Sequence, residues 1–198
     1  MINYTQRLDS AIRIAAWAHE QAGQHRKGTD IPYIIHPFGV MTIASGVTGD
    51  EDTLIACLLH DILEDVDTGI YSEDQMRNDF GDNVVTIVKD VTKDDTLPDW
   101  HAISNAYLDH LQNNACDEAV IVSAADKIHN LQATIIDYHA VGEELWQRFT
   151  TKNSADQLWW YESILKVLQI RNGPAKLCDD LAARVTKLQQ IVATKEPL

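Results

Sequence analysis

The sequence predicts an all-α fold. Apolar residues recur at spacings of three and four almost throughout the 198 residues, and no sustained alternation rich in β-branched residues interrupts them. Hydrophobic residues make up 45% of the chain, which is enough to form a sizeable core. We therefore expect one compact helical domain over residues 1–198, with a motif-bearing core at about 5–135 and C-terminal helices at about 142–195.

Helical periodicity and boundary residues place the first helices. One is expected at about 5–21, with apolar residues along one face. Pro37 favours a helix start and restricts the residue before it, so His36 is expected at the mouth of the second helix. Asp50 or Asp52 can cap a third helix, whose apolar residues surround most of its circumference, as in a central buried helix.

The third helix is expected to continue through residues 60–65. After it, Ser72 and Gln75 form a capping-box pattern that opens a short helix ending at Gly81. The remaining helices are separated by polar breaks, and the last again has a proline near its start. They are expected at 83–91, about 101–113, about 117–135, about 154–171, and from 174 to about 193.

Charge and composition exclude several kinds of partner. Sixteen basic and thirty acidic residues give a net charge of −14, which repels nucleic-acid polymers and anionic membranes. The longest apolar run, 54–59, is too short to cross a bilayer, and the N-terminus lacks the apolar block of a secretion signal. The three cysteines form no CxxC pair. We expect a cytoplasmic protein, and a small phosphorylated ligand stays compatible with the charge, because a metal and local cations can reverse the potential within one cleft.

Four residues suit the ligands of a metal ion: His36, His60, Asp61 and Asp126. His60 and Asp61 lie about 100° apart on a helix, so one cation beside that helix can reach both. Unpaired charge is costly in such apolar surroundings, and Asp126 lies in the similarly apolar run AVIVSAADKIHNL. The alternative is a hydrogen-bonded His60–Asp61 pair with an ordinary Asp126–lysine salt bridge, but the whole combination favours a metal. Two imidazoles and two carboxylates suit Mn, Fe, Co, Mg or Zn, and ligand type alone does not choose among them.

Two further acids, Glu64 and Asp65, follow one helical turn after the central pair and extend the same polar stripe. Hydrolysis needs a bound water and a group that handles its protons. The spacing does not divide the two roles between these acids. The other six histidines, His129 among them, and the aromatic run at 159–161 are expected to be structural, through hydrogen bonds, solvation or packing.

With these residues in place, the chain resembles the HD-domain metal phosphohydrolases. The stretches GQHRKGTDIPYIIHP, LIACLLHDILEDV, VTIVKDVTK and SAADKIHNL narrow the resemblance to the hydrolase domain of the Rel and SpoT enzymes and their small single-domain relatives. These stretches occur in the expected order over about 15–135, and the C-terminal third follows the resemblance only loosely. The resemblance implies an all-helical fold and Mn²⁺-dependent removal of the 3′-pyrophosphate from (p)ppGpp.

The resemblance also implies roles by position. The residues that would hold the metal ion are His36, His60, Asp61 and Asp126. The hydrolytic acids would be Glu64 and Asp65. Contacts to the nucleotide would come from Arg26, Lys27 and Asn130. Without the resemblance, the two loop cations are equally compatible with solvated surface charge.

Two departures concern the nucleotide contacts. After the HN pair at 129–130 the long enzymes usually continue with an M-R-T-like run, whereas residues 131–133 read LQA here, which removes a hydroxyl and a cation. The loop between Arg26 and His36 also looks one residue longer than in those enzymes. Two alternatives therefore stay open: an HD-type hydrolase of another nucleotide or phosphorylated metabolite, such as NADPH or a nucleoside phosphate, and a nucleotide sensor that does not hydrolyse. The sequence leaves a homo-oligomer open as well.

Overall fold

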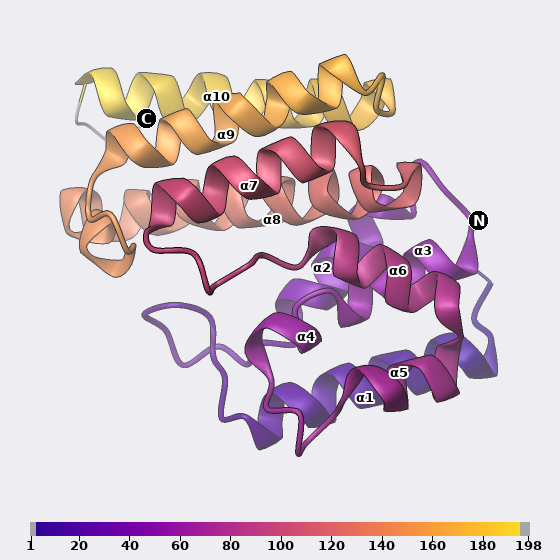
Figure 1. Ribbon diagram of the computed structural model, residues 1–198. Coiled ribbons are helices and arrows are strands. Elements are labelled where there is room, and N and C mark those ends of the chain that lie inside the picture. Colours follow the sequence, from indigo (N-terminus) through magenta and orange to yellow (C-terminus); the bar gives the residue numbers. More distant parts are fainter. Residues whose placement is uncertain (1–2, 195–198) are drawn as a thin grey trace.

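The computed structural model describes residues 3–194, and helices dominate this part of the chain (Figure 1). The elements are α1 (Gln6–Gln21), α2 (Ile35–Ala44), α3 (Glu51–Leu59), α4 (Ile62–Asp65), α5 (Glu73–Phe80), α6 (Asp82–Val91), α7 (Trp100–Asn113), α8 (Asp117–Val141), the 3₁₀ helix η1 (Gly142–Arg148), α9 (Ser154–Ile170) and α10 (Ala175–Thr194). Within 3–194 no strand occurs, and His25 and Pro32 form an isolated bridge. The predicted all-α class is confirmed, while the predicted C-terminal boundary near 195 lies outside the described residues.

Helix α8 runs through the middle of the fold. It packs against α2, α3 and α6 on one side and against α9 and α10 on the other, while α1 packs on α3 and α5 on α6 (Figure 1). The apolar side chains of α8 that these neighbours cover include Val122, Ile128 and Leu131, each exposed by 1% or less. Each such side chain stabilises the fold by roughly 1.5–3 kcal/mol. Asp126 therefore lies on a helix that neighbouring helices cover on two sides.

Side-chain caps explain where several helices begin. Thr5 accepts from the Leu8 N–H at the start of α1, and Asp50 accepts from the Thr53 N–H at the start of α3. The Ser72–Gln75 capping box opens α5 as predicted. Helix α5 ends at a glycine, Gly81, whose φ of 90° suits a residue without a Cβ.

The predicted continuous helix through 60–65 is wrong. The chain leaves the α3 helix at His60 and Asp61 and resumes in the short α4. The His60 Nδ1–H donates to the Cys57 carbonyl over 2.9 Å, and in an unbroken helix that carbonyl would accept from the Asp61 N–H. This competition loosens the helix, and Asp61 has φ −91° and ψ −5°. The break places the histidine and the aspartate on a corner between two helices.

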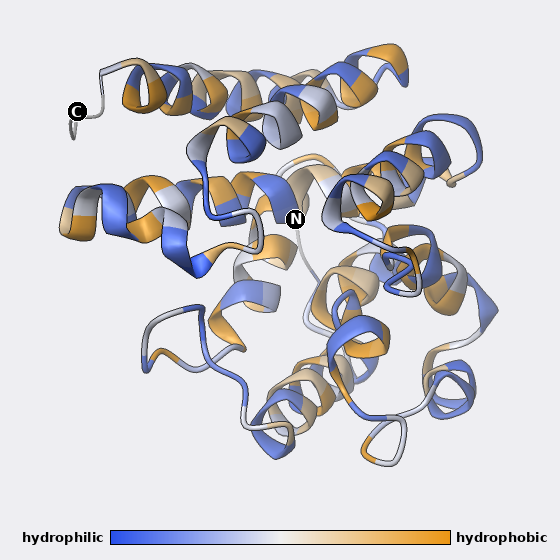
Figure 2. Ribbon diagram, turned by 60° about the vertical axis from the view of Figure 1, so that its left-hand side comes forward, coloured by the Kyte–Doolittle hydropathy of each residue, from blue (hydrophilic) through white to orange (hydrophobic). Residues whose placement is uncertain are grey.

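Other boundaries also differ from the prediction. Helix α2 begins at Ile35, so His36 lies within its first turn rather than before it. Helix α8 continues beyond the predicted end near 135, because Tyr138 is buried and its ring lies 5.4 Å from that of Trp146 in η1. Hydrophobic and hydrophilic residues alternate around most of the helices (Figure 2). Over the described range, no helix combines the length and apolarity needed to span a membrane.

Candidate active site

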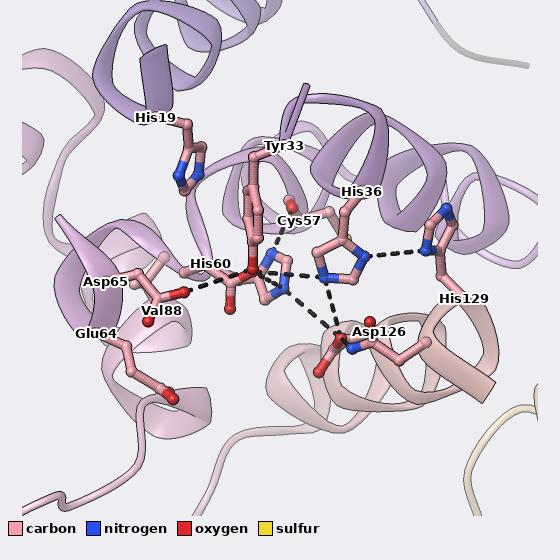
Figure 3. Close-up of polar contacts among 12 residues, drawn as sticks. His19, Tyr33, His36, Cys57, His60, Glu64, Asp65, Val88, Asp126 and His129 are labelled. Carbon is pink, nitrogen blue, oxygen red and sulfur yellow. Dashed lines mark hydrogen bonds and ion pairs between the residues drawn. The ribbon is translucent and has the colours of Figure 1, made fainter. Parts of the chain in front are cut away.

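Three buried side chains from separate elements converge on one point. His36 comes from α2, His60 from the corner after α3, and Asp126 from α8 (Figure 3). One ligand atom from each lies within 4.8 Å of the others, and His36 Nε2 is 3.2 Å from Asp126 Oδ1. Residues separated by up to 90 positions in the chain thus form one cluster of nitrogen and oxygen donors.

Asp61 completes the predicted set of four. Its Oδ2 lies 3.4 Å from His36 Nε2 and 3.1 Å from His60 Nε2. The hydroxyl of Tyr33 donates to the same oxygen over 2.6 Å. The fold therefore brings all four predicted ligands together, and Tyr33, which lies beside the cleft, holds one of them.

The donor set fits a metal ion. Because the His60 Nδ1–H is committed to Cys57, the Nε2 atom is left with a lone pair. This Nε2 is buried and makes no hydrogen bond of suitable geometry with any described residue, although Asp61 Oδ2 lies 3.1 Å away. A buried nitrogen without a partner is costly, and a cation bound at the cluster would satisfy it. The other ring nitrogen of each histidine, Nδ1, is hydrogen-bonded to a protein group, as is usual for metal-binding imidazoles.

The carboxylates of the cluster stay ionised. Burial alone would raise the pKa of Asp61, but the imidazoles of His60 and His36 outweigh it and hold that pKa well below its usual range. Lys127 and His36 do the same for the pKa of Asp126 against its burial. Burial would lower the pKa of His60, but without a bound cation Asp61 and Asp126 raise it to about 10, so a metal ion at Nε2 would take the place of a proton. The cluster therefore attracts positive charge.

The two predicted hydrolytic acids lie beside this cluster on α4. The pKa of Asp65 rises to about 6, because the surrounding protein partly desolvates this exposed residue's carboxyl and because Asp61 and Glu64 lie near it. Its Oδ2 is 3.4 Å from the Tyr33 hydroxyl. Glu64 diverges from it and pairs with Lys93 over 3.1 Å (Figure 3). The pair does not form the single stripe expected from an unbroken helix, but Asp65 can exchange a proton near neutral pH.

A cavity of about 740 Å³ adjoins the cluster and the two acids. Ligand sites typically enclose about 300–1,000 Å³, so the space suits a nucleotide. The cations that line it are Arg26, Lys27, Lys93, Lys127 and Arg148. The acids that line the same cavity are Asp61, Glu64, Asp65, Asp126 and Asp137, so its formal charges balance although the whole chain carries −14. The cavity thus offers phosphate groups a local environment that the whole surface does not.

The three predicted nucleotide contacts line the same cavity. Arg26 donates to Asn130 Oδ1 over 2.7 Å, and the Asn130 amide donates to Asp126. The guanidinium carbon of Arg26 lies 5.6 Å from the centre of the Tyr33 ring. Lys27 Nζ lies 5.5 Å from the Phe149 ring centre, and partial desolvation lowers the pKa of this exposed lysine.

Several residues that line the cavity were not predicted from the sequence to belong to the site. Lys93 belongs to the recognised stretch VTIVKDVTK, but only the fold brings it to Glu64. Arg148 lies on η1, 121 residues after Lys27, and reaches Asp137 over 3.1 Å. No motif marks it. Trp160 was expected to be structural and is buried, but it also lines the cavity and lies under the Lys127 ammonium group.

Residues 131–133, which differ from the M-R-T-like run of the long enzymes, lie in different surroundings. Leu131 is fully buried, whereas Gln132 and Ala133 line the cavity. Gln132 accepts from the Arg184 guanidinium of α10 over 3.2 Å. Thr134, one position later, also lines the cavity. A hydroxyl is therefore present on this wall, although one residue further along the helix.

Comparisons with known proteins agree with this site. A profile of the HD domain family matches residues 11–152. The chain is 38% identical over 166 residues to guanosine-3′,5′-bis(diphosphate) 3′-pyrophosphohydrolase MESH1 of Xenopus tropicalis, which covers 82% of this chain and 85% of that protein. For the Homo sapiens protein of the same name the values are 32% over 168 residues, with 83% and 86% covered. The chain therefore belongs to the HD domain family and is a metal-dependent phosphohydrolase.

Longer relatives match only in part. Guanosine-3′,5′-bis(diphosphate) 3′-pyrophosphohydrolase of Aquifex aeolicus is 37% identical over 91 residues, or 46% of this chain and 13% of that protein.

A solved structure of a metazoan SpoT orthologue, described as hydrolysing ppGpp, shares the fold with a TM-score of 0.78 at 24% identity, covering 97% of this chain and 99% of that one. Within the HD domain family the chain is thus a SpoT-type hydrolase related to the metazoan MESH1 proteins.

Proposed function

We propose that this protein removes the 3′-pyrophosphate from guanosine 3′,5′-bis(diphosphate), with Mn²⁺ held by His36, His60, Asp61 and Asp126. The observation that carries the proposal is the convergence of His36, His60 and Asp126, with Asp61 beside both imidazoles, at the edge of a cavity that cations and acids line together. The names of the relatives that align over most of their length support the same substrate. A divalent ion held by these residues would supply Lewis acidity to the phosphate and lower the pKa of water.

Glu64 and Asp65 are the proposed acid–base groups. Hydrolysis at the 3′ position takes a proton from water and gives one to the departing 3′-oxygen, which becomes the 3′-hydroxyl. Asp65, with its pKa raised to about 6, suits exchange of a proton near neutral pH. Glu64 is oriented by the Lys93 ammonium group and by the Lys93 backbone N–H, at 3.1 and 3.2 Å. Two carboxyl groups beside the donor cluster give the site the groups that turnover requires and that binding alone does not.

The cavity lining places cations next to aromatic rings, with Arg26 beside Tyr33 and Lys27 beside Phe149. Arg26, Lys27 and Asn130 are the proposed nucleotide contacts, and Lys93 and Arg148 add positive charge on the same lining. Arginine can form a bidentate pair with phosphate or stack its guanidinium plane on a base. We further propose that the chain acts as one HD-type domain on a small nucleotide rather than on a nucleic-acid polymer. The predicted cytoplasmic location and homo-oligomer stay predictions.

A substrate panel tests the assignment. Purified Mn²⁺-loaded protein is incubated separately with ppGpp, pppGpp, NADPH and GTP, and the products are separated by ion-exchange chromatography. We expect ppGpp to yield GDP and pyrophosphate in equal amounts, and pppGpp to yield GTP and pyrophosphate. NADPH and GTP should stay intact.

Other outcomes distinguish the alternatives. Consumption of NADPH or GTP with ppGpp intact would assign the site to another phosphorylated metabolite, as the changed lining at Gln132 and Ala133 would allow. Binding of ppGpp without any product, measured by calorimetry, would indicate a sensor.

A further inference from the structure

The two ring nitrogens of His36 face different partners. Nε2 faces Asp61 and Asp126 at 3.4 and 3.2 Å, whereas Nδ1 lies 3.0 Å from His129 Nδ1 (Figure 3). The two rings lie 4.9 Å apart, centre to centre, with their planes inclined at 56°. His129 lies one turn after Asp126 on α8. It is not one of the residues that form the donor cluster.

The proton count fixes the direction of this hydrogen bond. An imidazole that binds a cation through Nε2 carries its proton on Nδ1. The Nδ1–H of His36 must then donate, and Nδ1 of His129 must accept. Such a partner sets the tautomer and the ring orientation of a metal-binding histidine. His129 in turn carries its own proton on Nε2.

Gly39 provides the space for the His129 ring. A Cβ built on Gly39 would lie 2.2 Å from His129 Cδ2 and 2.4 Å from Nε2, closer than atoms of folded proteins approach. Gly39 lies inside α2, where glycine is less favourable than alanine by about 1 kcal/mol. The glycine therefore weakens its helix at the one place where the His129 ring packs against the α2 backbone.

We propose that His129, seated against Gly39, is a positioning residue that holds His36 in the tautomer and orientation required for metal binding. The inference rests on the metal site proposed above. Gly39→Ala can distinguish whether His129 positions His36 or only stabilises the fold. Alanine at position 39 favours the helix but displaces the His129 ring. Metal affinity should consequently fall in Gly39→Ala even though the fold stays intact.

The test is the Kd for Mn²⁺, measured by calorimetry on the metal-free protein and on three variants. Loss of a group that orients a metal ligand typically weakens metal binding by about 10–100-fold. We expect a weakening of about 10-fold for His129→Ala and for Gly39→Ala, within that range. His129→Asn, whose side-chain oxygen can accept in place of Nδ1, should bind Mn²⁺ nearly as tightly as the wild type.

A double variant and a control glycine complete the design. Gly39→Ala should add little to His129→Ala, because both changes remove the same contact. Gly49→Ala is the matched control, since a Cβ there meets nothing within 4 Å, and it should leave the Kd unchanged. Far-UV circular dichroism checks folding, and His129→Asn provides the comparison if His129→Ala unfolds.

The outcomes separate the two proposals. Absence of Mn²⁺ binding by the wild type would overturn the metal site itself. Wild-type affinity in both His129→Ala and Gly39→Ala would overturn the positioning role alone. Weak binding by His129→Asn equal to that of His129→Ala would also contradict it, because the accepting atom would then be irrelevant.

Discussion

Glu64→Gln and Asp65→Asn should each lower kcat for pyrophosphate release by about 10²–10⁴-fold, the range that a positioned acid or base contributes. Each change keeps the size of the side chain and one accepting oxygen, and removes the charge and the ability to exchange a proton. Neither side chain belongs to the donor cluster, so the Kd for Mn²⁺ should stay near that of the wild type. Turnover under saturating Mn²⁺ and calorimetric titration of the metal give the two quantities.

Glu73→Gln is the control for this prediction. Glu73 lies on α5, where it pairs with Arg77 and Lys89, and it does not line the cavity. Its replacement should leave kcat unchanged. Wild-type turnover by both Glu64→Gln and Asp65→Asn would remove these acids from the mechanism, whereas a lost Mn²⁺ affinity would place them among the metal-binding groups instead.

Lys127→Met should cost the metal-free protein about 3 kcal/mol of unfolding free energy. Removal of one member of a buried ion pair typically costs about 3–5 kcal/mol, because the other charge is left uncompensated. The Lys127 side chain is 6% exposed and that of Asp126 is 9% exposed, and the two are in direct contact. The lower end of the range applies because His36 and His60 still face the carboxylate.

Chemical denaturation with a chelator present measures this loss. Lys89→Met serves as the control, since the side chain of Lys89 is 56% exposed and pairs with Glu73 at the surface, and it should change stability by less than about 0.5 kcal/mol. Added Mn²⁺ should stabilise Lys127→Met more than the wild type, because the ion supplies positive charge next to Asp126. Equal stability of the two lysine variants would show that the buried ammonium group does not compensate Asp126.

The donor set was predictable because each member departs from its local sequence. His36 precedes a proline, and Asp126 interrupts an apolar run, so both are visible without a structure. The helix break at His60 was not visible, because it depends on a side-chain bond to Cys57 that competes with the regular backbone pattern. That bond also commits one nitrogen of His60 and leaves the other for a ligand.

Groups that reach the site from distant segments escaped prediction for a different reason. Arg148 carries no periodic or motif signal, and its place beside Lys27 depends on how η1 folds back on α8. His129 looked like one structural histidine among several. Its contact with His36 and its fit against Gly39 require the packing of α2 on α8, which spacing along the chain does not encode.

Return of metal to the stripped protein tests the central claim most directly. The protein is freed of metal with a chelator, dialysed, and assayed for pyrophosphate release from ppGpp while Mn²⁺ is titrated in. We predict no release without metal and a rise in turnover that saturates as one ion binds per chain, with His60→Ala inactive throughout. Full turnover in the presence of the chelator, or a wild-type response in His60→Ala, would contradict hydrolysis at this site.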